Sequence, residues 1–358
     1  MSPRTPPRPL SASERPPAAV YDVALLDLDG VVYVGSDPVP GAPEQLRKAA
    51  EAGMRIGYVT NNASRTPEAV AEQLRSFGLP ARTEDVVTSA QAVSELVAAE
   101  FPPGSPVLVV GGEGLREGLE ESGLVLVAGS DDKPVAVVQG FAPDVTWVML
   151  AEGAHAINAG AKWFASNLDL TLPTPRGRAP GNGALVRAVR AAVDVDPVVA
   201  GKPSPPLLLT SIERLHAERP LMVGDRLDTD IAGAFAVGIP SLWVATGVNT
   251  AADLVEAPAE QRPTYVAAGL AALAEPQPGV ESADGVHRCG GWRATIEGRV
   301  VRLSGEGDPY DGLRALLAAA WEAADAGIAV DATEALAIVG MRSRDTVASD
   351  ARHTPRRT

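Results

Sequence analysis

Two carboxylates and a glycine follow an apolar run near the start of the chain. Asp27 and Asp29 come directly after Val23–Leu26, and Gly30 follows them. The apolar run is typical of a buried strand in a parallel sheet. Residues two apart in an extended chain point the same way, so both carboxylates can start on one side of the strand end. Gly30 lets the backbone turn sharply there and approach a ligand closely. Two like charges at a buried strand end are costly unless a cation lies between them.

Polar residues also follow two further predicted strands. Thr60 and Asn61 come after one of them, and Asp225 and Asp230 come after another. Ligands of open α/β sheets bind beyond the carboxyl ends of the strands, so these clusters are candidate site residues. Carboxylates from two strand ends suit a hard cation such as Mg²⁺, which takes oxygen ligands and keeps several waters.

Lys202 lies between the apolar residues 198–200 and a predicted helix start. A lysine, a hydroxyl and an amide together suit the oxygens of a phosphate group. In such a site Asp27 would attack phosphorus in line and form an aspartyl phosphate. Asp29 would protonate the leaving alcohol and then deprotonate the water that hydrolyses the intermediate. The cation and Lys202 would offset negative charge on the nucleophile and on the transferred group.

Strands and helices alternate along residues 20–101, which predicts a doubly wound parallel sheet. A second α/β pattern occupies 102–194, and we interpret it as an inserted domain because the sheet pattern resumes over 195–275. The remaining regions are a disordered leader, a linker, a small α+β domain and a polar tail, at 1–19, 276–285, 286–341 and 342–358.

Three local patterns give finer expectations. Residues 167–182 are polar and rich in proline, which predicts a loop. Alternation over 291–303 predicts a hairpin with its turn at 297–299, and Ala335–Val339 is interpreted as a strand. The large aromatic residues Trp147, Trp163 and Trp243 are expected in the core.

Composition narrows the class of protein. The chain has 358 residues and a formal net charge of -14, which argues against a nucleic-acid or anionic-membrane partner. Its single cysteine, Cys289, allows no internal disulfide and no cysteine cluster for zinc. The N-terminal residues lack the apolar centre of a signal peptide, and no apolar run reaches the roughly 18 residues of a membrane span. We expect a cytoplasmic protein.

Taken together, the polar clusters resemble the four motifs of the haloacid dehalogenase superfamily, and they occur in that family's order. The matching segments are Asp27-Leu28-Asp29-Gly30-Val31, Thr60-Asn61-Asn62, Lys202-Pro203 and Gly224–Asp230. The insertion resembles the large α/β cap of the p-nitrophenyl-phosphatase-like branch, through Ala165–Asp169, Pro173-Thr174 and Gly181–Leu185. The resemblance covers about residues 20–275. It implies an α/β fold: a doubly wound, Rossmann-like core with an inserted α/β cap, followed by the small α+β domain.

The resemblance also implies roles for the motif residues. Asp27 is the nucleophile and Asp29 the general acid and base, with Gly30 supporting the turn. Thr60, Asn61 and Lys202 hold the phosphate group. Asp225 binds Mg²⁺ together with Asp27 and Asp29, and Asp230 is a supporting acid. An acid at Asp29 favours phosphoester transfer over dehalogenation, which lacks that proton transfer.

The leaving alcohol must be recognised largely by the inserted domain. Its polar segment from Asn167 to Asn182 is the best candidate, so both asparagines are predicted to contact substrate. The alternative is that they are ordinary turn residues.

The C-terminal region resembles that of glycerol-3-phosphate phosphatases, in which it has been likened to an acetyltransferase fragment. We find no acetyl-coenzyme A phosphate loop in 280–345, so a structural or homodimer-contact module is expected there. The predicted function is Mg²⁺-dependent hydrolysis of a small phosphorylated alcohol, with glycerol 3-phosphate foremost. Alternative substrates are 2-phosphoglycolate, pyridoxal phosphate, and sugar or aryl phosphates. A sensor that only binds a phosphometabolite is a further alternative, which the intact set of Asp27, Asp29, Lys202 and Asp225 disfavours.

Overall fold

The structure is a computed structural model that describes residues 8–174 and 176–341. The predicted tail, and the first part of the predicted leader, lie outside these residues. Contacts divide the chain into two compact units. Within the described residues, one unit comprises 8–24, 39–55 and 219–341, and the other comprises 25–38 and 56–218.

Six strands form the first sheet, in the order β15-β14-β13-β1-β4-β5. Their bounds are Tyr265–Ala267 (β15), Ser241–Val244 (β14), Pro220–Gly224 (β13), Val23–Leu26 (β1), Arg55–Thr60 (β4) and Val86–Thr88 (β5). The pairs β13–β14, β14–β15 and β4–β5 are parallel. Strand β1 is buried along its whole length, as expected for a strand that is covered on both faces.

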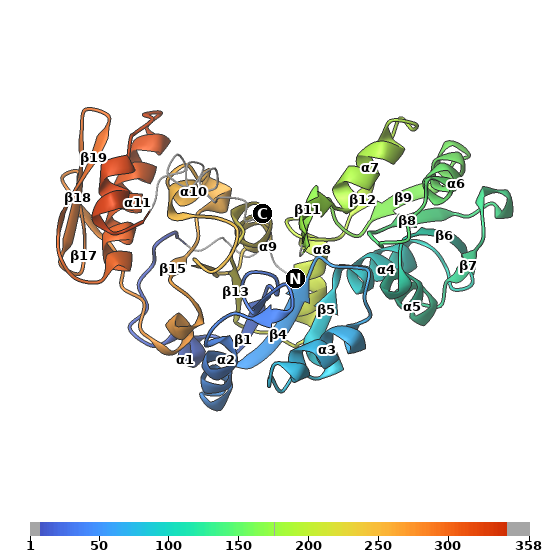
Figure 1. The fold of residues 1–358 in the computed structure, drawn as a ribbon, viewed down its shortest axis with the longest axis horizontal. Coiled ribbons are helices and arrows are strands. Elements are labelled where there is room, and N and C mark those ends of the chain that lie inside the picture. Colours follow the sequence, from blue (N-terminus) through green and yellow to red (C-terminus); the bar gives the residue numbers. More distant parts are fainter. Residues whose placement is uncertain (1–7, 175, 342–358) are drawn as a thin grey trace, which may run out of the picture. The chain divides into compact units, whose positions relative to one another are not determined.

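The second sheet belongs entirely to the unit formed by 25–38 and 56–218. It has the order β12-β9-β8-β6-β7, and every pair in it is parallel. The bounds are Val198–Val199 (β12), Lys162–Ala165 (β9), Ala136–Gln139 (β8), Pro106–Val110 (β6) and Val125–Val127 (β7). Helices α6 (Trp147–Asn158) and α7 (Asn182–Arg190) pack together beside this sheet (Figure 1). Their buried side chains form one core with those of β6, β8 and β9.

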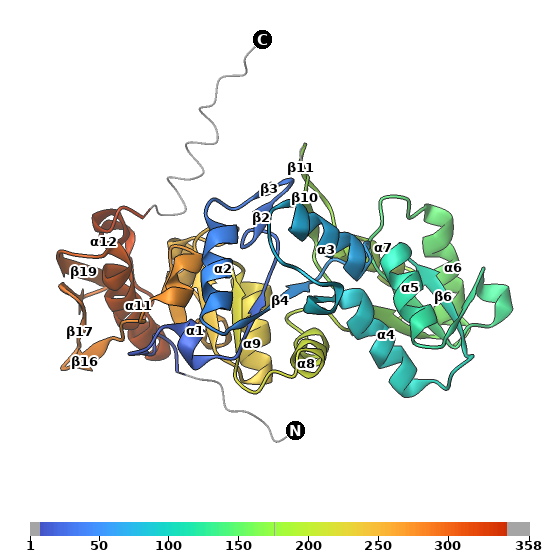
Figure 2. The same cartoon turned by 90° about the horizontal axis from the view of Figure 1, so that it is seen from below.

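Helices α4 (Ser89–Glu100) and α5 (Glu113–Glu121) lie side by side in the same unit (Figure 2). Thr88 caps α4 and forms a capping box with Gln91, whereas Gly112 precedes α5 without a side-chain cap. The remaining helices are α3 (Pro67–Ser76) and α8 (Pro205–Arg214). Both begin at proline, which fits the first helical turn because its missing N–H has no partner there.

The other unit joins the last strands of the first sheet to the C-terminal region. There the antiparallel sheet β16-β17-β18-β19 packs against α11 (Pro309–Asp325) (Figure 1). The strand bounds are Glu281–Ala283 (β16), Val286–Cys289 (β17), Trp292–Glu297 (β18) and Val300–Gly305 (β19). The short elements of this unit are α1 (Pro17–Val20), α2 (Ala42–Glu51), α9 (Ala232–Val237), α10 (Ala251–Val255) and α12 (Thr333–Ile338).

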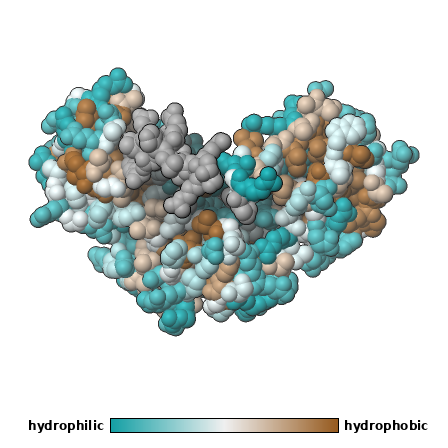
Figure 3. Space-filling view, in the orientation of Figure 1, coloured by the Kyte–Doolittle hydropathy of each residue, from teal (hydrophilic) through white to brown (hydrophobic). Residues whose placement is uncertain are grey.

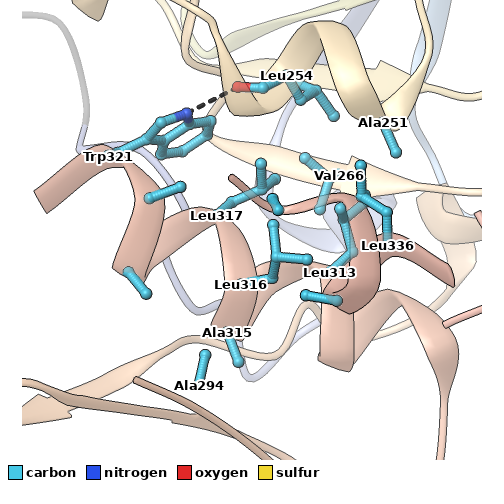
Figure 4. Close-up of a cluster of buried hydrophobic side chains, with 14 of the residues drawn as sticks. Ala251, Leu254, Val266, Ala294, Leu313, Ala315, Leu316, Leu317, Trp321 and Leu336 are labelled. Carbon is cyan, nitrogen blue, oxygen red and sulfur yellow. Dashed lines mark hydrogen bonds between the residues drawn. The ribbon is translucent and has the colours of Figure 1, made fainter. Parts of the chain in front are cut away.

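The leucines of α11 share one buried core with Leu254 of α10 and Val266 of β15 (Figure 4). Trp321 of the same helix donates from Nε1 to the carbonyl of Leu254 at 2.8 Å. Residues 281–341, here called the C-terminal module, are therefore packed into this unit by a continuous apolar cluster and a buried hydrogen bond.

The α/β class, the Rossmann-like sheet and the hairpin over 291–303 are confirmed. The domain boundaries stay predictions, because the contacts divide the chain elsewhere. One pairing bears on them: β12, which we assigned to the resumed core, is hydrogen-bonded to β9 of the second sheet.

Several local predictions are wrong. The segment 167–182 contains an antiparallel hairpin, β10 (Thr171–Thr174) with β11 (Gly177–Pro180), rather than a loop alone. Residues 335–338 belong to α12 instead of a strand, since a short apolar run suits either element. The predicted linker 276–285 includes β16. Trp147 is 78% exposed, whereas Trp163 and Trp243 are buried as expected.

The predicted disordered leader is also wrong for residues 8–19. Ser13 and Gln277 exchange two backbone hydrogen bonds at 2.8 Å, and the side chain of Leu10 is buried. Pairing with residues that are distant in sequence orders this proline-rich segment.

Candidate active site

The side chains of Asp27 and Lys202 meet at the end of β1. Nζ of Lys202 donates to Oδ1 of Asp27 at 2.6 Å and to the carbonyl of Val59 at 3.3 Å. The lysine side chain is 1% exposed and that of Asp27 14% exposed, so this ion pair is largely shielded from water. Burial raises the pKa of Asp27, and the Lys202 ammonium opposes that rise. The arrangement presents a carboxylate beside a fixed cation, as a nucleophile toward phosphate requires.

Asp29 lies two residues further, after the chain has begun to turn. Gly30 has a φ of 87°, a conformation that favours glycine, and its N–H donates to the carbonyl of Tyr33 at 2.8 Å. Asp29 is exposed, but the surrounding protein atoms desolvate its carboxyl and raise the pKa of Asp29; the nearby Asp169 adds to the rise, whereas Lys202 opposes it. A raised pKa suits a group that must carry a proton before it can give one away.

Thr60 ends β4, next to β5 in the sheet, and Asn61 follows it. Thr60 is 3% exposed, and its hydroxyl accepts from the N–H of Asn62 at 3.1 Å. The carbonyl of Asn61 accepts from Ser89 Oγ at 2.5 Å. The carboxamide of Asn61 contacts the backbone of Lys202 rather than open space, with Oδ1 accepting from its N–H at 2.8 Å.

The two asparagines predicted to contact substrate are buried and bind backbone. Asn167 is 4% exposed, and its Nδ2 donates to the carbonyl of Asn61 at 2.7 Å. Asn182 is 1% exposed and donates to the carbonyl of Asn167 at 2.8 Å. These contacts give both side chains a role in holding the segment after β9 in place. Substrate contact by either one stays a prediction.

Asp225 and Asp230 belong to the other unit, where both are buried. Asp225 follows β13, and its Oδ2 accepts from the N–H of Val248 at 2.5 Å. Asp230 accepts from the N–H of Arg226 at 3.1 Å. A carboxylate oxygen from each lies within 4.8 Å of the other. Two buried carboxylates at this separation offer the hard oxygen donors that a divalent cation takes.

Glycines allow this close approach. A Cβ on Gly224 would lie 2.2 Å from the Cβ of Asp230, and one on Gly247 would lie 2.0 Å from Oδ2 of Asp225. Both distances are far below van der Waals contact, so each acidic side chain fills the space beside a glycine. In the Gly224-Asp225 dipeptide, the glycine leaves room for the Asp230 side chain, and the aspartate offers a carboxylate oxygen.

The sequence reasoning missed Ser89, Asp169 and Arg65. Ser89 follows the end of β5, so the rule that ligands lie beyond strand ends could have indicated it. Oδ2 of Asp169 accepts from Asn61 at 3.1 Å, a contact across 108 positions that no local pattern reveals. Arg65 is close enough to Asp29 to oppose the rise in its pKa.

Comparison with protein-family models places these residues in a known family. Residues 24–125 match the model described as haloacid dehalogenase-like hydrolase, and 199–273 match one described as HAD-hydrolase-like. A D-glycerol 3-phosphate phosphatase from Mycobacterium tuberculosis is 44% identical over 323 residues, which cover 86% of this chain and 87% of the relative. The chain belongs to the haloacid dehalogenase-like hydrolase family.

Solved structures of this family show the same fold. A glycerol phosphate phosphatase from Mycobacterium tuberculosis in complex with magnesium has a TM-score of 0.80 at 44% identity, over 86% of this chain and 92% of the other. A p-nitrophenyl phosphatase from Archaeoglobus fulgidus has a TM-score of 0.65 at 30% identity, over 71% and 98%. An acid sugar phosphatase from Staphylococcus aureus is 38% identical over 236 residues, which cover 65% of this chain and 90% of the relative.

A third family model, the GCN5-related N-acetyltransferase like domain, matches residues 289–341. That likeness raises the question of an acetyl-coenzyme A site, whose phosphates would suit a helix N-terminus. The N-terminus of α11 instead carries carboxylates. Asp308 caps it by accepting from Tyr310 N–H at 2.7 Å, and Asp311 pairs with Arg314 at 2.9 Å. These acids would repel a phosphate group, so the residues present do not fit that cofactor.

Proposed function

We propose that this protein is a Mg²⁺-dependent phosphatase that hydrolyses a small phosphorylated alcohol through an aspartyl phosphate on Asp27. The observation that carries the proposal is the buried pair of Asp27 and Lys202, 2.6 Å apart, with a second carboxyl at Asp29. A protein that only bound phosphate would have no need of a nucleophile and a proton donor together. Family membership supports the same reaction.

The first half-reaction transfers the phosphoryl group from the substrate to Asp27. A carboxylate oxygen of Asp27 attacks phosphorus and forms a P–O bond, while the bond from phosphorus to the alcohol oxygen breaks. Asp29 gives its proton to the departing oxygen, which leaves as the neutral alcohol. We assign Lys202 and the Thr60 hydroxyl as donors to the phosphoryl oxygens, where negative charge builds up.

The second half-reaction reverses the role of Asp29. It is now ionised and accepts a proton from a water molecule as that water attacks phosphorus. The bond between phosphorus and Asp27 breaks, which releases inorganic phosphate and restores both carboxyl groups. One acid therefore serves both steps without another proton carrier.

Asp27, Asp29 and Asp225 are the residues that we assign to Mg²⁺, with Asp230 in support. Asp27 follows β1, and Asp225 follows β13. Both offer carboxylate oxygens, the ligands that Mg²⁺ prefers. When bound, the ion neutralises charge on the phosphoryl oxygens. The magnesium complex of the Mycobacterium tuberculosis phosphatase supports Mg²⁺ as the ion.

Glycerol 3-phosphate is the substrate that we propose first. The relative named for that activity matches 86% of this chain, whereas the acid sugar phosphatases match 65%. Sugar phosphates are the second candidate, because those relatives are still 38% identical. The other monoesters named from the sequence rank below these two.

The testing experiment is a phosphate-release screen over small phosphomonoesters, with and without Mg²⁺, on the wild type and Asp27→Asn. The wild type should release phosphate from glycerol 3-phosphate only when Mg²⁺ is present. Asp27→Asn keeps the shape but removes the attacking charge, so its turnover should fall to background while thermal unfolding stays cooperative. Activity above a few per cent of wild type in this variant would contradict the covalent mechanism.

Two further proposals concern the setting of the enzyme. In residues 8–174 and 176–341, none of the helices is both long and apolar enough to cross a membrane. We propose a cytoplasmic location, in keeping with a phosphometabolite substrate.

We also propose that the protein forms a homodimer. Trp147 and Val148 of α6 are exposed, and these side chains favour a partner surface on α6. Figure 3 shows apolar patches on the part that carries α6 and α7.

A further inference from the structure

The carboxamide of Asn61 is fully used by contacts within the protein. Its Oδ1 accepts from the N–H of Lys202 at 2.8 Å, and its Nδ2 donates to the carbonyl of Lys202 at 3.0 Å. The second hydrogen of Nδ2 points to Oδ2 of Asp169, 3.1 Å away. An amide nitrogen has two hydrogens, so neither is left for a phosphate oxygen. Asn61 thus grips both backbone polar groups of one residue, and that residue is Lys202.

The backbone of Asn61 is fixed from two directions. Its carbonyl accepts from Ser89 at the end of β5 and from Nδ2 of Asn167, which follows β9. A side chain that is to hold another residue must itself be held, and these contacts meet that requirement.

The chain that leads to Lys202 is a short extension of the second sheet. Strand β12 pairs with β9, and the N–H of Ala200 donates to the carbonyl of Ala165 at 3.0 Å. Gly201 then passes through a narrow gap. A Cβ there would lie 2.5 Å from the carbonyl oxygen of Ser166 and 2.8 Å from Oδ1 of Asn61. The lysine backbone is therefore enclosed by the segment after β9 on one side and by Asn61 on the other.

We propose that Asn61 is a positioning residue, which holds Lys202 toward Asp27 through a brace that ends on Asp169 of the inserted segment. The inference rests on the proposed function, since Lys202 matters there as the cation that faces Asp27 and phosphate. It assigns Asn61 a role through its side chain that differs from direct phosphate binding. It also makes Asp169 part of the phosphate site through one intermediate residue.

Reversal of the hydrogen bond between residues 61 and 169 tests the brace. Asn61→Asp puts oxygens against the Lys202 carbonyl and against Asp169, so it should repel both. Adding Asp169→Asn restores a donor to that contact, although the bond to the Lys202 carbonyl stays lost. Asn158→Asp is the matched control, because the exposed Asn158 also donates to a backbone carbonyl, that of Ala192, at 3.1 Å.

The measurements are kcat and KM on glycerol 3-phosphate and p-nitrophenyl phosphate with Mg²⁺, and binding of inorganic phosphate by calorimetry. We expect Asn61→Asp to lower kcat/KM about 100-fold on both substrates and to weaken phosphate binding about 10-fold. The double variant should recover about 10-fold of the lost kcat/KM, as coupled neighbours do. Asn158→Asp should match wild type.

Three results would overturn the brace: wild-type phosphate affinity in Asn61→Asp, a double variant no better than Asn61→Asp, or a loss confined to one substrate. A wild type that binds phosphate but hydrolyses neither ester would instead refute the proposed function, and phosphate binding by the variants would still decide the brace. A wild type that does not bind phosphate would overturn both.

Discussion

In the proposed mechanism the Asp27 carboxylate attacks phosphorus in its ionised form, and the contact with Lys202 favours that form. The ammonium stabilises the charged form that burial alone would disfavour. Its position is set in turn by backbone contacts with Asn61. The chemistry at one residue therefore depends on a chain of contacts that spans 175 positions of sequence between Asp27 and Lys202.

Removal of the buried Asp225 carboxylate, which follows β13, should weaken the binding of Mg²⁺. We predict that Asp225→Ala raises the Mg²⁺ concentration needed for half-maximal activity by at least about 10-fold, since one charged oxygen ligand is lost. Titration of activity with Mg²⁺ measures this shift. Asp228→Ala is the control, because Asp228 is an exposed acid of the same loop that pairs with Arg226. An unchanged Mg²⁺ requirement in Asp225→Ala would remove this residue from the metal site.

Asn182 should act on every substrate alike. Asn182→Ala removes the donor to the Asn167 carbonyl, a buried contact whose loss costs roughly 1–3 kcal/mol of stability. Because that contact holds the segment after β9, we predict similar falls in kcat/KM for glycerol 3-phosphate and p-nitrophenyl phosphate. Steady-state kinetics on both esters, with the midpoint of thermal unfolding, checks the prediction. A fall in kcat/KM for glycerol 3-phosphate alone would instead indicate that Asn182 contacts the alcohol directly.

The candidate residues at strand ends could be named from the sequence, because each lies in a short motif next to an apolar run. Asp27, Asp29, Thr60, Lys202 and Asp225 were all named in this way. The partners of Asn61 were not, since Asp169 and Lys202 lie 108 and 141 positions away. A sequence shows that an amide is present, but its hydrogen-bond partners depend on the fold.

At the scale of elements, the close packing of the first turn of α5 explains the glycine at position 114. A Cβ on Gly114 would lie 2.5 Å from the Arg65 carbonyl oxygen and 2.7 Å from that of Ala63. The first turn of α5 thus packs directly on the backbone that continues from Thr60 and Asn61. Only a residue without a side chain permits this approach.

Gly114→Ala should therefore displace the loop after β4. Both contacted atoms are backbone, which cannot rotate away, so we predict a fall in kcat/KM of about 10-fold or more together with reduced stability. The control is Gly118→Ala in the same helix, where the nearest atom is Oγ of Ser94, a side-chain hydroxyl that can turn aside. Kinetics and thermal unfolding of both variants give the comparison. Equal activity in the two would show that the loop tolerates the displacement.

Elements of ambiguous pattern were the ones predicted wrongly. Ala335–Val339 is too short for its period to be read, and α12 forms there because its buried face, with Ala335 and Leu336, packs in the C-terminal core. The hairpin β10–β11 is rich in proline and polar residues, which usually mark loops. In both cases tertiary contacts outweigh the local signal.

At the scale of the molecule, the C-terminal module is an integral part of the unit that holds Asp225. Arg314 of α11 is 6% exposed and donates to the Val266 carbonyl of β15 at 2.7 Å. The guanidinium of Arg262 lies over the ring of Trp321, 5.3 Å from its centroid. Composition and alternation predicted a small α+β region here, but they could not show that its helix completes the core beside β15. Such packing is a property of surfaces that meet only after folding.

Trp321 offers a direct test of this shared core. Trp321→Ala removes a buried ring and the donor to the Leu254 carbonyl, so we predict a loss of about 3–5 kcal/mol in the free energy of unfolding. Because the cluster spans α10, β15 and α11, residues 219–341 should unfold in one transition, and Asp225 should lose its surroundings in that same transition. Denaturant unfolding followed by circular dichroism, with activity measured in parallel, checks both points. Trp147→Ala is the matched control, since that ring is 78% exposed and its loss should change stability little. Separate transitions for the C-terminal module and for activity would show that the module folds independently of the site.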